Sequence, residues 1–219
     1  MTREAPPAPP VAAAVFGAAL PAAERYVARL ATDGVTRGLI GPREVGRLWE
    51  RHVLNSAAVA EAVPSGARVV DVGSGAGLPG IPLGLARPDL SVTLVEPMAR
   101  RVEFLTEAVD ELAAVLGDRR WTVVRGRAEE RSVVTAVGPV DVVTARAVAP
   151  LPRLVAWCGG LLRPGARLVA LVGATAVAEL PSVLDELRAA GMTEVESRAV
   201  GAELGDAATT VVVMPRGPR

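Results

Sequence analysis

The stretch "RVVDVGSGAGLPGIPL" at residues 68–83 constrains the fold of this chain more than any other feature. An apolar, β-branched run leads to Asp71, and glycine then follows at positions 73, 75, 77 and 80. An apolar strand that ends in a glycine-rich turn before a helix is typical of a parallel sheet with helical crossovers. The stretch therefore predicts an α/β fold with a ligand site at the carboxyl ends of its strands.

From residue 66 onward the chain alternates between strand-like and helix-like segments. Strands are predicted over residues 67–73, 91–97, 121–126, 140–147, 166–173, 193–200 and 208–215. Helices are predicted over residues 78–87, 98–116, 150–162 and 174–190. This alternation predicts parallel pairing with right-handed crossovers, while the short loop between the last two strands predicts an antiparallel pair. We expect a Rossmann-like, doubly wound, mostly parallel sheet of seven strands.

Two helical segments, residues 11–33 and 42–63, precede the first predicted strand. We predict an N-terminal helical cap over residues 11–64 and a sheet domain over 65–219, packed as one unit. Residues 1–10, with "APPAPP", are expected to be a disordered tail. The apolar run "VAAAVFGAAL" resembles part of a signal peptide, but it continues into the amphipathic "PAAERYVARLA". We expect a helix there and no membrane span.

The charge pattern limits the classes of partner. The formal net charge is zero, which argues against a general polyanion binder but allows a local basic face. All 24 cationic side chains are arginine, and several cluster at 100–101, 119–120, 125–131 and 146–153. The one cysteine, Cys158, excludes an internal disulfide and points to a reducing, cytoplasmic compartment. No metal site is expected.

The spacing of the glycines distinguishes between cofactors. A dinucleotide fingerprint that begins at Gly73 requires a third glycine where Leu78 stands, and one that begins at Gly75 starts two residues late. A phosphate loop requires a lysine, which the sequence lacks. The pattern through Gly75 and Gly77 fits a turn for S-adenosylmethionine, which has no pyrophosphate and needs close approach of the backbone.

Other candidate cofactor residues follow the predicted strands. Asp71 could orient the turn or reach the methionine ammonium group, and Glu96 could accept both ribose hydroxyls, as in NAD enzymes. Ala128 and Glu129 are placed to flank the adenine. Arg146 could bind a carboxylate or a phosphate. Each feature also has a purely structural interpretation. The glycines could form a plain tight turn, and Glu96 could be a solvated strand end. The run at 125–131 could be an exposed charge run, and Arg146 could form a surface ion pair.

The segment after the fourth predicted strand, "TARAVAPL", lacks the residues that methylation of an exocyclic amine of a base requires. Methylation of an exocyclic amine needs an acid or amide followed by prolines and an aromatic residue. Cys158 lies in an apolar helix and is expected to be a core residue, and His52 is expected to pack or hydrogen-bond in a pocket. These features favour a nucleophile that needs no deprotonation, such as guanine N7, with catalysis by orientation and charge stabilisation.

Three segments together resemble ribosomal small-subunit RNA methyltransferase G, the family also called glucose-inhibited division protein B. They are "RHVLNS" at 51–56, "DVGSGAGLPGIPL" at 71–83 and "ARAVAPL" at 145–151. The similarity runs from about residue 20 to the end of the chain. It implies transfer of a methyl group from S-adenosylmethionine to N7 of a guanine in 16S ribosomal RNA, in a monomeric, cytoplasmic enzyme that acts on the small ribosomal subunit.

The resemblance also implies roles for individual residues. The implied cofactor contacts are Gly73, Leu78, Ala128, Glu129 and Arg146, with Glu96 on the ribose. The residues implied to line the substrate side, and to position the substrate together with Arg146, are Arg51, His52, Asn55 and Ser56. The arginine clusters, rather than the resemblance, supply the candidate RNA contacts, which are Arg100, Arg101, Arg125, Arg127 and Arg153. The chain departs from the family at Val172–Gly173, where Lys-Gly is usual, and at Glu96, where Asp is frequent.

Two other functions remain open at this point. A small-molecule methyltransferase would share the cofactor site but would not depend on the arginine clusters. A redox or nucleotide-binding domain would bind NAD and ignore S-adenosylmethionine, although the glycine register disfavours this interpretation.

Overall fold

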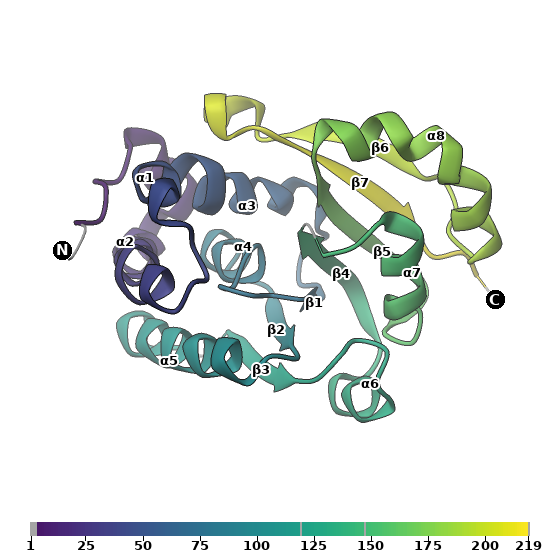
Figure 1. The fold of residues 1–219 in the computed structure, drawn as a ribbon, viewed down its shortest axis with the longest axis horizontal. Helices are drawn as coiled ribbons and strands as arrows, with labels where there is room; N and C mark the ends of the chain where they lie inside the picture. The colour runs from purple at the N-terminus through teal and green to yellow at the C-terminus, as the bar shows by residue number, and fades with distance from the viewer. Residues whose placement is uncertain (1–3, 119, 147, 219) are drawn as a thin grey trace.

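A computed structural model describes residues 4–118, 120–146 and 148–218 of the chain (Figure 1). Within these residues one sheet has seven strands in the order β3-β2-β1-β4-β5-β7-β6. The strands are β1 (Arg68–Val72), β2 (Ser91–Glu96), β3 (Trp121–Arg125), β4 (Val140–Arg146), β5 (Leu162–Val172), β6 (Glu196–Val200) and β7 (Thr209–Pro215). The first five pair in parallel, and β7 pairs antiparallel with both β5 and β6. The predicted doubly wound, mostly parallel sheet is confirmed.

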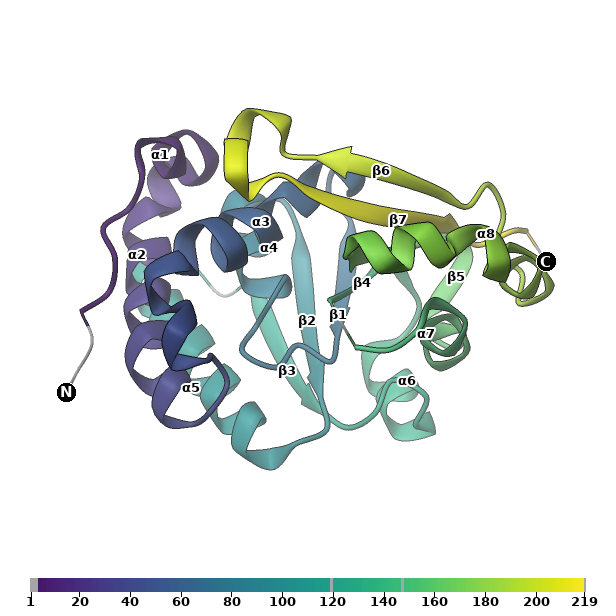
Figure 2. The same ribbon diagram turned by 45° about the horizontal axis from the view of Figure 1, so that its top comes forward.

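Helices cover both faces of the sheet (Figures 1 and 2). One face carries α1 (Pro10–Phe16), α2 (Leu20–Arg29), α3 (Asn55–Ala57), α4 (Gly80–Ala86) and α5 (Ala99–Leu116). The other carries α6 (Arg131–Val137), α7 (Leu151–Cys158) and α8 (Ala174–Ala189). Consecutive residues of β1 face opposite layers. Val69 packs in the core beneath α1–α5, the first core cluster, and Val70 packs in the core beneath α6–α8, the second core cluster. The central strands are therefore buried on both faces, as their continuous β-branched runs predict.

The strand order places a switch point between β1 and β4. From β1 the chain moves outward to β2 and β3, and it then returns to the other side of β1 to add β4 and β5. The segments that leave the carboxyl ends of β1 and β4 run to opposite sides, so an open crevice forms between them. The glycine-rich turn after Val72 and the segment after Arg146 both begin there.

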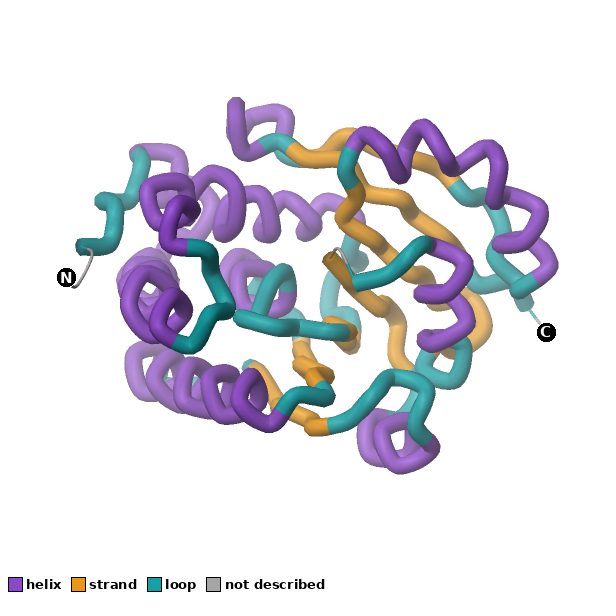
Figure 3. The backbone as a smooth tube through the Cα atoms, in the orientation of Figure 1, coloured by secondary structure: helices purple, strands orange, loops and turns teal. Residues whose placement is uncertain are grey.

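The N-terminal cap is helical as predicted (Figure 3), but along its two long helices the backbone changes between α, 3₁₀ and π geometry. The 3₁₀ segments of the chain are η1 (Gly17–Ala19), η3 (Pro42–Arg47), η5 (Ala58–Ala62) and η6 (Ala202–Ala207), and the π segments are η2 (Leu30–Gly34) and η4 (Leu48–Leu54). Proline stands in the first turn of two of these segments, Pro21 in α2 and Pro42 in η3, where the second predicted helix begins. Proline is compatible with a first turn because no backbone N–H is needed there.

Helix α2 attaches the cap to the sheet domain. Tyr26, Val27 and Leu30 are almost fully buried. Arg29 pairs with Glu107 at 3.1 Å and Glu111 at 2.7 Å, both on α5. By length and mean hydropathy, Pro10–Gly34 is the one stretch among the described residues that could cross a membrane, although no such span was predicted. In this fold its inner side chains form part of the core.

The start of the chain lies against the cap. Residues 1–3 of the predicted disordered tail lie outside the described residues. Residues 4–9 have no regular secondary structure, but the indole Nε1 of Trp49 donates a hydrogen bond to the carbonyl of Pro6 at 3.0 Å. Ala5 and Ala8 also pack against the core.

Two elements differ from the expectation. Helix α6 was not predicted because its seven residues follow the charged run "RGRAEER", and its apolar face consists mainly of Val133 and Val137. The helix predicted over 150–162 ends at Cys158, and β5 begins at Leu162. The apolar residues 161–162 fit a buried helix and a buried strand equally well, so periodicity did not separate the two.

Candidate functional site

The glycine-rich turn closes tightly over the end of β1. The backbone N–H groups of Gly73 and Ser74 both donate to the carbonyl of Val95, at 2.9 and 3.2 Å. Gly73 has φ of +69°, and a Cβ there would lie 3.0 Å from Cγ2 of Val148. At Gly77 φ is +99°, and a Cβ would lie 2.4 Å from Cδ1 of Ile81. Glycine is required at both positions because a side chain would be strained and would lack space.

Asp71 lies beneath this turn and orients it. Its side chain is fully buried, and Oδ2 accepts hydrogen bonds from the hydroxyl of Ser74 at 2.6 Å and from the N–H of Gly80 at 3.1 Å. The hydroxyl of Thr144 donates to Oδ1 at 3.3 Å. Burial raises the pKa of Asp71 to about 7, although these hydrogen bonds favour the charged form. Asp71 does not line the cavity described next, so its contacts match the orienting role.

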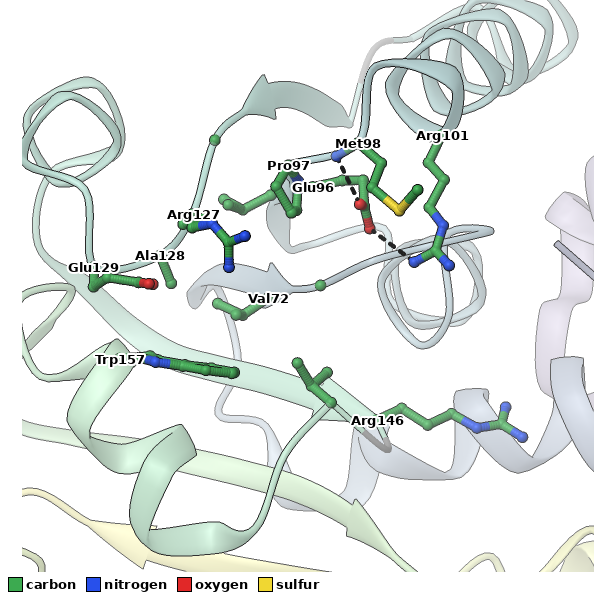
Figure 4. A pocket seen from close by; sticks show the side chains of 14 residues that line it. Val72, Glu96, Pro97, Met98, Arg101, Arg127, Ala128, Glu129, Arg146 and Trp157 are labelled. Atoms are coloured by element: carbon green, nitrogen blue, oxygen red, sulfur yellow. Dashed lines mark hydrogen bonds and ion pairs between the residues drawn. The ribbon is translucent and has the colours of Figure 1, made fainter.

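A cavity of about 430 Å³ opens at the switch point (Figure 4). It lies between the carboxyl ends of β1, β2, β3 and β4 and the start of α5. Five residues that the sequence singled out as cofactor contacts line it: Gly73, Glu96, Ala128, Glu129 and Arg146. The other lining residues are Val72, Val95, Pro97, Met98, Arg101, Gly126, Arg127, Val148 and Trp157.

Glu96 is the most constrained polar side chain of this cavity. It is 1% exposed, and its two oxygens accept from backbone groups on either side. Oε2 accepts from the N–H of Gly75 at 3.0 Å and Oε1 from the N–H of Met98 at 2.9 Å, while a guanidinium nitrogen of Arg101 lies 3.7 Å from Oε2. A carboxylate has about four lone-pair sites, so acceptor capacity remains for a ligand diol.

The other cavity walls suit an adenosine group. Met98, Ala128 and Trp157 present apolar surface, and Figure 4 shows the Trp157 ring on the side opposite Met98. The Nε of Arg101 is buried and has no hydrogen-bond partner among the described residues. A buried carboxylate for the ribose, apolar walls for the base and an unsatisfied donor together fit S-adenosylmethionine. No group of side chains suited to a metal ion occurs in the described part of the chain.

Arg146 connects this cavity to the cap. Its guanidinium points away from the cavity in Figure 4 and donates to the hydroxyl of Ser56 at 3.1 Å and to the carbonyl of Arg51 at 2.8 Å. It also lies 3.5 Å from Nδ1 of His52. Burial lowers the pKa of Arg146. In the described residues its hydrogen-bond partners are neutral, so a partly buried positive charge lies beside the switch point without a carboxylate in contact.

His52 bridges Arg146 and Glu44. Its Nε2 lies 3.1 Å from a carboxylate oxygen of Glu44. Burial, followed by the neighbouring Arg146, lowers the pKa of His52 against the opposing effect of Glu44. A neutral ring that donates from Nε2 and accepts at Nδ1 satisfies both neighbours. This arrangement holds the His52 ring between Glu44 and Arg146.

The remaining predicted site residues lie further from the cavity. Asn55 donates to the carbonyl of Ala207 in η6 at 3.4 Å. Leu78 is partly buried and packs on the first core cluster. Neither lines the cavity. Cys158 is fully buried, and burial raises its pKa to about 12, which agrees with its expected place in the core.

The candidate RNA arginines fall into two groups. Arg101 and Arg127 line the cavity itself. Arg153 is exposed, and its guanidinium lies 5.9 Å from the ring centroid of Trp157. Arg100 and Arg125 are exposed at the start of α5 and the end of β3. The cavity is therefore bordered by elements that carry exposed cations.

Sequence reasoning missed three residues of the site. Met98 could have been predicted from the sequence, because it lies two residues after Glu96 in the same strand-end turn. Trp157 gave only the signal of a helical residue next to a core cysteine. Tyr26, from the cap, is buried and donates to the carbonyl of Ala76 in the glycine turn at 2.7 Å. A contact across 50 positions leaves no local trace in the sequence.

The sequence is similar to a known protein family over most of its length. Residues 19–204 match the family model for rRNA small subunit methyltransferase G. The chain is 55% identical over 204 residues to ribosomal RNA small subunit methyltransferase G of Mycobacterium sp. (strain KMS), covering 93% of this chain and 88% of the relative. It is 54% identical over 209 residues to the protein of that name from Streptomyces avermitilis, covering 95% and 85%.

The fold is similar to that of solved methyltransferases. A predicted O-methyltransferase from Agrobacterium tumefaciens superposes with a TM-score of 0.58 at 16% identity, covering 77% of this chain and 82% of that one. This similarity concerns the fold alone. The family model and the sequence relatives go further, and they show that the chain belongs to the rRNA small subunit methyltransferase G family.

Proposed function

We propose that this protein transfers a methyl group from S-adenosylmethionine to N7 of a guanine in 16S ribosomal RNA. The observation that carries the proposal is the family match over residues 19–204, which includes every wall of the switch-point cavity. When bound, S-adenosylmethionine supplies an electrophilic methyl group on a positively charged sulfur. The residues of the protein must then bind the cofactor and the substrate, orient them and stabilise the charge that develops.

The cofactor would be held by the residues that line the cavity. Glu96 would accept both ribose hydroxyls with the lone pairs that Gly75 and Met98 leave free. Met98 and Trp157 would contact the two faces of the adenine, and Ala128 and Glu129 its edge. Because Gly75 and Met98 already fix the Glu96 carboxylate, little ordering is required on binding.

The proposed reaction needs no general base. N7 of guanine carries a lone pair in the plane of the ring and no proton, so the protein must only bring that edge in line with the methyl group. His52, with its lowered pKa and its contacts to Glu44 and Arg146, would hold the substrate side in place rather than accept a proton. The positive charge that arrives on the base calls for nearby negative or polar groups.

The substrate is proposed to be the small ribosomal subunit or its RNA. Exposed arginines on α5, β3 and α7 would contact phosphates. We propose that the cap, residues 11–64, and the methyltransferase domain, residues 65–219, act as one unit in a cytoplasmic monomer. The ion pairs between α2 and α5 support this unit.

Calorimetry followed by a transfer assay tests the proposal against its two alternatives. S-adenosylmethionine should bind and NAD should not, since the spacing of the glycines in the turn does not match the dinucleotide fingerprint. Labelled methyl groups should then enter RNA of small subunits from cells that lack this enzyme. Binding of NAD alone would favour a redox domain, and labelling of small molecules but not RNA would favour the other methyltransferase class.

A further inference from the structure

A second cavity adjoins the cofactor cavity. It has a volume of about 170 Å³ and lies at the carboxyl ends of β4 and β5, beside α7 and α8. Val148 lines both cavities, and its side chain lies 3.0 Å from the position of a Cβ on Gly73. A molecule in the second cavity would therefore be separated from the glycine turn by little more than this side chain.

The lining of the second cavity is apolar apart from one ionisable side chain. Ala145, Leu151, Leu171 and Val172 contribute aliphatic surface suited to the faces of a planar ring. Glu179, on the second turn of α8, is the one charged residue among the described lining residues. Its carboxylate forms no hydrogen bond or ion pair with a described residue, and Glu179 is exposed. It is therefore an anion that a ligand can reach without breaking an existing contact.

On the basis of the proposed function, we propose that this cavity receives the target guanine and that Glu179 recognises its Watson–Crick edge. The two carboxylate oxygens would accept from N1–H and from the N2 amino group of guanine. Adenine presents a lone pair at N1 and no donor at C2, so a carboxylate at this place would repel it. Enzymes that modify an unstacked base read it by such contacts along its Watson–Crick edge.

The placement is consistent with attack from N7. The N1 and N2 donors lie on the Watson–Crick edge of guanine, which adjoins the edge that carries N7. A guanine whose Watson–Crick edge faces Glu179 on α8 can therefore turn its neighbouring N7 edge toward Val148, which separates this cavity from the cofactor cavity. The lone pair of N7 forms the new N–C bond, the S–C bond breaks with its electron pair retained on sulfur, and the purine becomes cationic. A carboxylate that accepts from N1–H and the N2 amino group would stabilise this charge.

The test compares Glu179→Gln and Glu179→Ala with the wild-type chain on two substrates. One is the small subunit reconstituted with its natural RNA, and the other carries inosine, which lacks the N2 amino group, at the mapped methylated guanine. A matched control is Glu186→Gln, which changes an exposed glutamate on the same helix that is not part of the cavity. Calorimetry with S-adenosylmethionine reports on folding and on the cofactor site.

Loss of the carboxylate should lower kcat/KM for the guanine substrate by about 10- to 100-fold, the value of one good bidentate contact. Affinity for S-adenosylmethionine should not change, and Glu186→Gln should behave as wild type. The wild-type chain should prefer guanine over inosine, and Glu179→Ala should lose that preference. Retention of the preference, or wild-type rates in both variants, would overturn the assignment of Glu179 alone. Absence of 7-methylguanosine with the wild-type chain would instead overturn the proposed function on which it rests.

Discussion

The hydroxyl of Tyr26 donates a 2.7 Å hydrogen bond to the carbonyl of Ala76, which joins the N-terminal cap to the centre of the glycine turn. The two residues are 50 positions apart, and Tyr26 is buried. The hydroxyl also lies close to Gly77, since a Cβ there would be 3.1 Å from the Tyr26 oxygen, in addition to its closer approach to Ile81. The cap is thus in direct contact with the loop that is proposed to bind the cofactor.

Tyr26→Phe should weaken cofactor binding without unfolding the protein. The ring still fills its site, but the Ala76 carbonyl loses a buried partner, which costs about 1–3 kcal/mol. Calorimetry should show weaker binding of S-adenosylmethionine, and urea denaturation a lower free energy of unfolding. If both quantities match the wild type, the hydrogen bond does not connect the cap to the turn.

Glu96→Gln should reduce affinity for S-adenosylmethionine by on the order of 100-fold, because an amide cannot accept from Gly75, Met98 and the ribose diol together. Glu103→Gln, an exposed change on α5, is the matched control. Calorimetric titration of the two variants provides the measurement. Equal affinities would remove Glu96 from the proposed ribose site.

Asp71 should make the stability of the fold depend on pH. Its pKa is near 3.8 in the unfolded chain and about 7 in the fold. The folded state therefore holds this proton more tightly, and stability is fully present below about pH 4 and is lost as the pH rises through 7. The difference corresponds to on the order of 4 kcal/mol above pH 7.

Asp71→Asn should abolish this contribution. The amide oxygen can still accept from Ser74 and Gly80, and the amide nitrogen can donate to Thr144. Urea denaturation from pH 4 to 8 should give a flatter stability profile for the variant than for the wild type. The same slope in both proteins would show that Asp71 does not titrate in this window.

Reversing the charge of Arg100 and Arg153 should weaken RNA binding but leave cofactor binding intact. For each arginine that no longer binds a phosphate, the slope of log K against log salt should fall by about 0.7–0.9. Arg188→Glu, on exposed α8, is the control. An unchanged salt slope in the double variant would contradict a phosphate-binding role for these arginines and would favour a small-molecule substrate.

The fold was largely predictable because its central strands are continuous apolar runs. "RVVDV" and its neighbours are buried on both faces, so composition alone identifies them. Gly73 and Glu96 of the site were also predictable, since both stand at strand ends that must meet at one edge. Leu78 belongs to the same motif, but its packing on the first core cluster depends on distant segments and was not predictable from the sequence.

What remained hidden depends on contacts between distant segments. Tyr26 and Trp157 reach the site only because the cap and α7 lie close to the carboxyl ends of the strands. Glu179 lies in an ordinary amphipathic helix, and its relation to a cavity appears only when α8 is placed beside β4 and β5. Helix α6 was too short for its periodicity to be recognised within a charged run.

The central claim is that the chain methylates N7 of guanine in small-subunit ribosomal RNA. Purified protein, S-adenosylmethionine with a labelled methyl group and small subunits from cells that lack the enzyme are incubated together, and the RNA is then digested to nucleosides. Mass spectrometry should find the label in 7-methylguanosine, at a single position of 16S rRNA. Label in any other nucleoside, or none in the RNA, would contradict the claim.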